Sequence, residues 1–203
     1  MGDGRRILRE AQTPKAHSQE LLGMIQEVLN AGGISLADLD VLACTRGPGH
    51  FTGIRIACSL IQGLALGLNK PVMALSSLQL MALGLYRNTA QHLSQVASDR
   101  QQIRDAAQHT RIFAYIPAYP APRIYGAYYE ADAQGVLQGI SAEAIYADQQ
   151  FLVDLCAQGW VVGTGEPCAA DLLLLAEQAY TAGQLMRPAD LQPVYLEGFL
   201  GAL

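Results

Sequence analysis

The residues best suited to chemistry in this chain form one glycine-rich run, Arg46-Gly47-Pro48-Gly49-His50-Phe51-Thr52-Gly53-Ile54-Arg55. A buried strand is expected before the run and a helix after it, and backbone amides at such a junction can hold an anion together with the helix dipole. The same residues also suit a structural turn, in which the glycines allow a tight backbone, Pro48 stiffens it and Thr52 caps the helix. The run therefore predicts either an anion-facing loop or a structural turn, formed by Arg46, Gly47, Pro48, Gly49, Thr52, Gly53 and Arg55.

The known nucleotide-binding fingerprints do not fit this run. A phosphate-binding P-loop needs a lysine after its last glycine, whereas Gly53 is followed by Ile54 and Arg55. A dinucleotide site needs an acidic residue ~20 positions further on. Residues 41–98 contain no carboxylate at all. Neither a ribose-binding acid nor a general-base carboxylate can therefore come from this part of the chain.

The histidines, serines and cysteines form no recognisable catalytic or metal-binding pattern. The four histidines (His17, His50, His92 and His109) include no His-x-x-x-His pair, so we expect no metal site. No serine lies in a Gly-x-Ser-x-Gly elbow, so peptidase activity is not expected. The cysteines include no Cys-x-x-Cys pair, and we interpret Cys44, Cys58, Cys156 and Cys168 as reduced packing residues. No cofactor is expected either.

The charges are distributed unevenly along the chain. Residues 1–111 hold eleven Lys/Arg and eight Asp/Glu, a net charge of +3, whereas residues 112–203 hold two and ten, a net charge of -8. This asymmetry indicates two structural units or two differently charged faces. An acidic second half would repel RNA phosphates. Its tyrosines (Tyr115, Tyr119, Tyr125, Tyr128 and Tyr129) are therefore better interpreted as half-buried sheet residues than as a base-stacking surface.

Hydrophobic periodicity predicts alternating strands and helices in the first half of the chain. Short strands are expected at residues 7–8, 41–45 and 72–75, and helices at residues 13–30, 52–68 and 77–86, with a capping box from Ser35 to Asp38. Residues 89–110 are polar and rich in glutamine, which indicates an insertion or a linker. This pattern predicts an α/β unit over residues 1–88.

The second unit is expected over residues 111–203. Two tyrosine-rich strands are predicted at residues 111–119 and 123–131, followed by a turn at 132–135. A helix that Asp148 caps, a strand at 160–162 and a helix at 171–182 complete the unit. The first residues are polar and unlike a signal peptide, so a cytoplasmic protein is expected.

The helix predicted at residues 52–68 has small residues on one face. Ser59, Gly63 and Gly67 are four residues apart, and each glycine costs ~1 kcal/mol relative to alanine inside a helix. Close approach of a partner helix would compensate for this cost, and packing against the sheet of the same unit is the alternative. The apolar stretch Ile54–Leu68 contains Arg55 and Gln62 and is shorter than ~18 residues, so no membrane span is expected.

Several motifs together resemble the TsaB (YeaZ) family of bacterial tRNA threonylcarbamoyladenosine biosynthesis proteins. They are residues 46–55, Gln62-Gly63-Leu64-Ala65-Leu66-Gly67, Pro71, Ser76-Ser77-Leu78 and His17-Ser18-Gln19-Glu20-Leu21-Leu22. Residues 160–165 and 193–196 carry a weaker similarity. The resemblance covers residues 5–86 well and the remainder loosely.

The resemblance implies an actin-like, RNase H-like (ASKHA) α/β fold of two lobes and a non-catalytic subunit. Such a subunit pairs with the catalytic subunit TsaD, and with the ATPase TsaE, to place threonylcarbamoyl on N6 of adenosine 37 in tRNAs that read ANN codons. It would touch tRNA only indirectly, and homodimers would use the same helices as the pairing with TsaD. The implied interface residues here are Leu21, Leu22, Met24, Ile25, Ser59, Gly63 and Gly67.

The sequence departs from the family pattern at two places. The family opens with two strands and an Asp-Thr-Ser-like turn, and this sequence starts after both, so we expect a sheet with an open edge and a tendency to aggregate. Residues 116–120 read Ile-Pro-Ala-Tyr-Pro where the family has an Ile-Asp-Ala-Arg-like stretch. Two alternatives therefore stay open, an ATP-dependent small-molecule kinase of the same superfamily and a non-functional truncated gene product.

Overall fold

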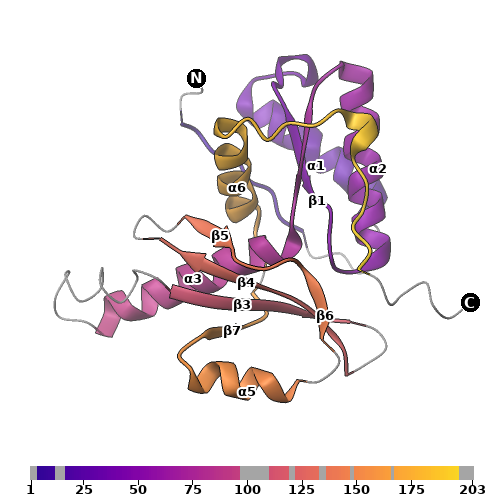
Figure 1. Ribbon diagram of the computed structural model, residues 1–203. Coiled ribbons are helices and arrows are strands. Elements are labelled where there is room, and N and C mark those ends of the chain that lie inside the picture. The colour runs from indigo at the N-terminus through magenta and orange to yellow at the C-terminus, as the bar shows by residue number, and fades with distance from the viewer. Residues whose placement is uncertain are drawn as a thin grey trace, which may run out of the picture. The chain divides into compact units, whose positions relative to one another are not determined.

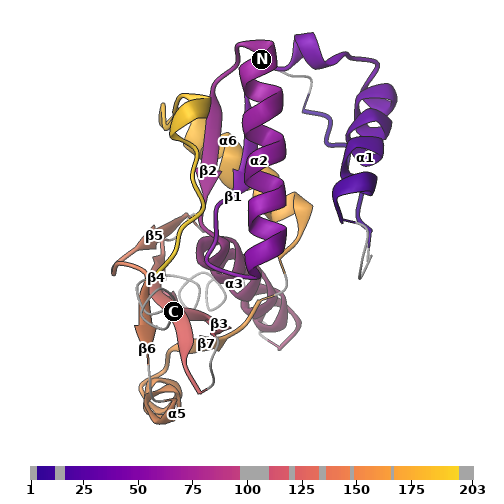
Figure 2. The same cartoon turned by 90° about the vertical axis from the view of Figure 1, so that its right-hand side faces the viewer.

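The computed structural model describes residues 4–11, 17–96, 110–118, 122–132, 136–146, 149–165 and 167–196 (Figures 1 and 2). The chain divides into two compact units. Unit 1 comprises Met1–Arg46, His50–Leu75 and Cys168–Pro193, and unit 2 comprises Gly47–Gly49, Ser76–Pro167 and Val194–Leu203. Each unit contains both helices and strands, in agreement with the predicted α/β class.

The division differs from the boundaries expected at residues 88 and 111. Helix α3 (Ser77–Val96) belongs to unit 2, because it packs on strand β3 (Thr110–Pro117). Helix α6 (Ala169–Thr181) belongs to unit 1, because it packs on the sheet of that unit. Helix α3 also runs ten residues beyond the predicted end at Tyr86, so the expected insertion does not begin at residue 89. Residues 97–109 lie outside the described residues.

Unit 1 is built on two short parallel strands, β1 (Leu42–Thr45) and β2 (Val72–Leu75). They pair in register from Leu42↔Val72 to Thr45↔Leu75, and helix α2 (Phe51–Leu68) forms the crossover between them. Buried side chains of β1, β2, α2 and the segment after η2 (Pro188–Asp190) form the core, namely Leu42, Cys44, Cys58, Ala65, Val72 and Leu191. The predicted strands and the helix at 52–68 are therefore confirmed.

In the described part of the chain, no further strand pairs with the free edge of β1. Among the described residues β1 pairs only with β2, which agrees with the open edge expected from the sequence. The predicted strand at Ile7–Leu8 is wrong, because residues 4–11 make no ladder and are held by side chains instead. Arg6 pairs with Glu177 of α6 at 2.8 Å, and Arg9 pairs with Glu27 of α1 (His17–Gly32) at 3.4 Å.

The capping box expected at Ser35 is present, although the helix that follows is a single 3-10 turn, η1 (Leu36–Asp38). The Ser35 amide donates to Asp38 Oδ2 at 2.9 Å and its hydroxyl donates to the same oxygen at 2.7 Å. These two donors lower the pKa of the Asp38 carboxyl, the backbone amide contributing most. The expected start of α1 at Thr13 lies outside the described residues.

Unit 2 contains a five-stranded sheet. Strand β3 pairs antiparallel with β4 (Ile124–Ala131) and parallel with β7 (Val161–Gly163). Two short strands, β5 (Leu137–Gly139) and β6 (Ala144–Tyr146), pair antiparallel with β4. Figure 1 shows α3 on one face of this sheet and α5 (Gln150–Ala157) on the other. The sequence patterns missed β5 and β6, because three residues are too short for a period to emerge.

The side chains of unit 2 confirm most of the expectations for this half. Tyr115, Tyr125 and Tyr128 are half-buried and Tyr129 is buried, as expected for sheet residues, and Tyr119 lies outside the described residues. The interpretation of all four cysteines as packing residues is wrong for Cys156, which is exposed on α5. The turn expected after Asp132 begins with a hydrogen bond from the Val136 amide to Asp132 Oδ1 at 2.8 Å. Asp148, the expected cap of α5, lies outside the described residues, and the helix begins after Gln149.

Candidate partner-binding face

The glycine-rich run leads directly into α2. The helix begins at Phe51, and its N-cap is His50, whose backbone is extended and whose carbonyl accepts the Ile54 amide at 3.1 Å. The prediction that Thr52 caps the helix is therefore wrong, because Thr52 already lies within the first turn. His50 makes no capping hydrogen bond with its side chain. The first amides of α2 are thus not satisfied by the N-cap side chain.

The backbone of the run has the features of a structural turn. Gly47 has a φ of +104°, a conformation that side chains with a Cβ rarely adopt, and Gly47 and Pro48 are both buried. Within unit 1, the Arg46 amide donates to the Leu75 carbonyl at 2.8 Å; within unit 2, the Gly47 carbonyl accepts the Ser77 amide at 2.9 Å. These backbone hydrogen bonds hold Arg46 and Gly47, at the start of the turn, in place.

The two arginines of the run have different surroundings. The guanidinium carbon of Arg55 lies 3.6 Å from the ring centroid of Phe51, one turn earlier on α2, which is a close cation–π contact. Arg46 is half-buried, and its Nε atom is buried without a hydrogen-bond partner among the described residues. Gly53 has open space where a Cβ would be. An anion-facing role for these residues stays a prediction.

The small residues of α2 lie on its exposed face. Ser59, Gly63 and Gly67 are all exposed, and a Cβ built on either glycine meets nothing within 4 Å. The opposite side of the helix carries the buried Cys58 and Ala65. The alternative in which the small residues pack against the sheet of their own unit is therefore wrong. We call Thr52, Arg55, Ser59, Gly63, Leu66 and Gly67, which are all exposed, the outer face of α2.

Leu66 is the residue of this face that the sequence interpretation missed. It is 58% exposed, more than Phe51 at 39%, the other exposed large apolar residue of α2, and it follows Gly63 by three positions. Helical spacing from the small residues would have placed it beside Gly63 and Gly67. The outer face therefore combines a flat backbone surface with one protruding apolar side chain.

The membrane argument from the sequence needs a correction. Helix α2 has 18 residues with a mean hydropathy of 1.5, so by length and composition alone it could cross a membrane. The length of this helix therefore does not exclude a membrane span. The structure nevertheless gives the helix a different role, because its inner face packs on β1 and β2 and Gln62 Nε2 donates to the Pro188 carbonyl at 2.9 Å.

The residues predicted on α1 are less exposed than those on α2. Leu22 is 52% exposed, whereas Leu21, Met24 and Ile25 are half-buried. Helices α1 and α2 contact each other within unit 1. Of the four predicted α1 residues, Leu22 is the one whose side chain is freely available to another protein.

Comparisons with known proteins agree with this architecture. The profile of the family "TsaD: tRNA N6-adenosine threonylcarbamoyltransferase" matches residues 10–102. The tRNA N6-adenosine threonylcarbamoyltransferase of Maricaulis maris is 39% identical over 69 residues, which cover 34% of this chain and 18% of that protein. The match to the transferase family model thus lies in about the first half of the chain.

Similarity to the TsaB proteins extends over nearly the whole chain. The "tRNA threonylcarbamoyladenosine biosynthesis protein TsaB" of Escherichia coli is 31% identical over an alignment of 207 positions, which covers 90% of this chain and 81% of that protein. The solved structure "YeaZ from Pseudomonas aeruginosa" superposes with a TM-score of 0.75 at 28% identity, over 97% of this chain and 92% of that one. The chain therefore belongs to the TsaB (YeaZ) family, within the actin-like ASKHA fold.

Proposed function

We propose that this chain is a non-catalytic subunit in the modification of tRNA with threonylcarbamoyladenosine. The observation that carries the proposal is the similarity to TsaB over nine-tenths of the chain, whereas the transferase family model matches residues 10–102. In this role the chain supports TsaD as TsaD transfers threonylcarbamoyl to N6 of adenosine 37 in tRNAs that read ANN codons. TsaE is the third subunit, the tRNA is touched only indirectly, and the reaction takes place in the cytoplasm.

The outer face of α2, together with Leu22, is the proposed contact with TsaD, and in its absence with a second copy of this chain. Two properties support this assignment. The face is exposed and carries Leu66 as its one large apolar side chain, and at Gly63 and Gly67 nothing stands between the helix backbone and an incoming helix. Small residues allow helix axes to approach more closely than the usual ~8–10 Å. Leu66 would then insert beside the partner helix as an anchor.

We further propose that the glycine-rich loop acts structurally, by fixing the start of α2. The backbone bonds of Arg46 and Gly47 and the positive φ of Gly47 support this role. The kinase alternative is disfavoured, because the similarity over nine-tenths of the chain is to TsaB. Arg55, held over the Phe51 ring, remains exposed at the edge of the outer face and can meet a carboxylate of the partner.

The proposal is tested by reconstitution. Purified TsaD and TsaE, with tRNA, ATP, threonine, bicarbonate and the enzyme that makes the activated threonylcarbamoyl donor, are assayed for modified adenosine by mass spectrometry, with and without this chain. We expect modification only when the chain is present, and a loss of at least tenfold with Gly63→Leu. Gly63→Ala is the matched control, since its methyl group is small enough for close helix packing.

Three results would contradict the proposal. Modification at an equal rate without the chain would remove the accessory role. Full activity of Gly63→Leu, with unchanged TsaD binding by analytical ultracentrifugation, would move the interface away from α2. ATP turnover by the isolated chain after rigorous purification would favour the kinase alternative.

A further inference from the structure

A short segment near the start of the chain, residues 6–10, lies in unit 1 and takes no part in its sheet. We call it the N-terminal strap. Two ion pairs hold it in place. Arg6 pairs with Glu177 of α6 at 2.8 Å, and Arg9 pairs with Glu27 of α1 at 3.4 Å. The partner face proposed above contains none of these four residues.

The strap runs along α6 in the opposite direction to the helix. Glu10 Oε1 accepts the amide of Ala169, the first residue of α6, at 3.4 Å, whereas Arg6 reaches Glu177 near the other end. Four residues of extended chain span ~13 Å, and eight helical residues rise ~12 Å. Since these two lengths agree, the strap is close to fully extended beside α6.

Successive side chains of the strap contact two different helices, as the two-residue period of an extended chain requires. The side chains at positions 6 and 10 contact α6, whereas Ile7 and Arg9 contact α1. A Cβ on Gly32, the last residue of α1, would lie 3.4 Å from Ile7 Cδ1, and Arg9 reaches Glu27 five residues earlier on the same helix. The strap therefore bridges α6 and α1.

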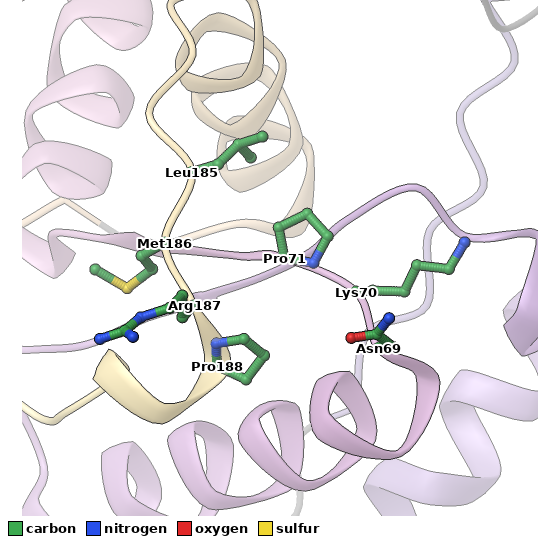
Figure 3. A pocket seen from close by; sticks show the side chains of 7 residues that line it. All are labelled: Asn69, Lys70, Pro71, Leu185, Met186, Arg187 and Pro188. Atoms are coloured by element: carbon green, nitrogen blue, oxygen red, sulfur yellow. The ribbon is translucent and has the colours of Figure 1, made fainter.

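Helix α6 is the firmly held side of this bridge. Its Leu175, Ala176 and Ala179 are buried, and the helix packs on β1 and β2. The segment that follows it is fixed as well, because Met186 and Val72 exchange two backbone hydrogen bonds, each 3.0 Å long. Figure 3 shows this segment beside the turn after α2. A side chain that is bound to α6 is thus bound to the core of unit 1.

Helix α1 is held by fewer contacts. Leu29 is its one buried side chain among the described residues, and Leu21, Met24, Ile25 and Val28 are half-buried. Within the described part of the chain, the pair between Arg9 and Glu27 is the only ion pair that joins α1 to another segment. The strap therefore contributes a larger share of what holds α1 than of what holds α6.

We propose that the N-terminal strap is a clamp that positions α1 on unit 1, with Arg6 and Arg9 as its positioning residues, and so presents Leu22 to the partner. The inference rests on the proposed function, in which Leu22 belongs to the contact with TsaD. When the clamp is released, α1 occupies the binding position for only part of the time, and the apparent Kd rises by the inverse of that fraction. The four paired side chains are each at least 44% exposed, so each ion pair contributes little, and we expect a change of about two- to threefold.

The first test is amide hydrogen exchange of the full chain, measured by mass spectrometry. We expect residues 20–29 of α1 to exchange about two- to threefold faster in both Arg9→Gln and Arg6→Gln, and α3 of unit 2 to stay unchanged. The Arg6→Gln result is decisive, because Arg6 contacts α6 and acts on α1 through the strap. Arg9→Lys keeps the charge and should restore most of the protection. Arg187→Gln removes an exposed pair with Asp190, 2.8 Å long, and is the matched control.

The second test is the tRNA modification assay as a function of TsaD concentration. Both glutamine variants should need about two- to threefold more TsaD for half-maximal modification and should reach the wild-type rate at saturating TsaD, since the clamp affects position and not chemistry. Exchanging the two charges in Arg9→Glu/Glu27→Arg should restore both readouts.

The outcomes separate the clamp from the proposed function. Unchanged exchange of α1 in Arg6→Gln would overturn the clamp. Faster exchange with an unchanged half-maximal TsaD concentration would overturn its role in presenting Leu22. If the wild-type chain has no effect on TsaD, the proposed function fails, and the exchange of α1 still decides whether the clamp exists.

Discussion

Glycines occur for opposite reasons in the two units of this molecule. On α2 of unit 1, Gly63 and Gly67 face open space, and a Cβ at either position would meet nothing within 4 Å. In unit 2, a Cβ on Gly165 would lie 2.5 Å from the Met81 carbonyl oxygen of α3, and one on Gly126 would collide with the Phe113 ring. A glycine with a close neighbour is explained by the fold. A glycine without one, inside a helix where it costs ~1 kcal/mol, points to something outside the chain.

The largest expected effect is that of Gly165→Ala. The new methyl group would press on the backbone of α3, which cannot turn away as a side chain can, so we expect a loss of about 3 kcal/mol in the free energy of unfolding, at the upper end of overpacking costs. Urea unfolding followed by circular dichroism measures it. A loss below about 0.5 kcal/mol would mean that the segment after β7 and helix α3 are less tightly packed than described.

Gly126→Ala should cost somewhat less, about 2 kcal/mol, because the obstacle is a side chain. Phe113 nevertheless has little freedom, since its ring lies edge-on against Tyr146 and Phe151, with centroids 5.3 Å away in both cases. A double-mutant cycle with Phe113→Leu isolates the contact. We expect the double variant to be more stable than the sum of the two single effects predicts. Additive effects would show that the Phe113 ring is not the reason for a glycine at position 126.

Gly63 should behave in the opposite way. Replacement by alanine or leucine meets no neighbour and improves helix propensity, so both variants should gain up to about 1 kcal/mol in the free energy of unfolding under dilute, monomeric conditions. At high protein concentration the wild type should have a higher melting temperature than Gly63→Leu, because association stabilises the folded state and the leucine blocks association. The measurement is the melting temperature as a function of protein concentration. A destabilised Gly63→Leu in dilute solution would place this face of α2 inside the protein.

The contrast between the units also shows how far the sequence could be interpreted. Apolar runs with clear flanking glycines and prolines identified β1, α2 and β2 with bounds close to those observed, and helical spacing placed Ser59, Gly63 and Gly67 on one face. The family motifs indicated the residues of the proposed interface but not Leu66, which extends the same spacing. The exposure of Gly63, on which the proposal depends, could not be inferred, because spacing does not say which face of a helix is covered.

The failures have a common physical origin in contacts between distant residues. Helix α6 returns from the end of the chain to pack on β1 and β2, so the composition change near residue 88 could not mark the units. Strands β5 and β6 are fixed by pairing with β4, with no apolar pattern of their own. Residues 7–8 are apolar, but among the described residues they have no strand to pair with, and an isolated extended segment is not a strand.

Near neutral pH, the smallest expected effect on stability concerns the inner face of α2, and it tests whether only the outer face is open. Cys44 of β1 and Cys58 of α2 are buried, and burial raises the pKa of both thiols, that of Cys44 to about 12 from 9.0. At pH 8 we expect iodoacetamide to label Cys156 within minutes and to reach Cys44 and Cys58 only on unfolding.

The raised pKa of Cys44 also determines the direction in which the free energy of unfolding changes with pH. The folded state keeps the thiol protonated up to about pH 12, while the unfolded chain ionises near 9.0, so the free energy of unfolding should fall as the pH rises between these values. Cys44→Ala should flatten that fall relative to wild type, and Cys156→Ala should leave it unchanged. Native-state labelling of Cys58 at the rate of Cys156 would show that the inner face of α2 opens as readily as the outer one, and the contrast on which the proposed interface rests would disappear.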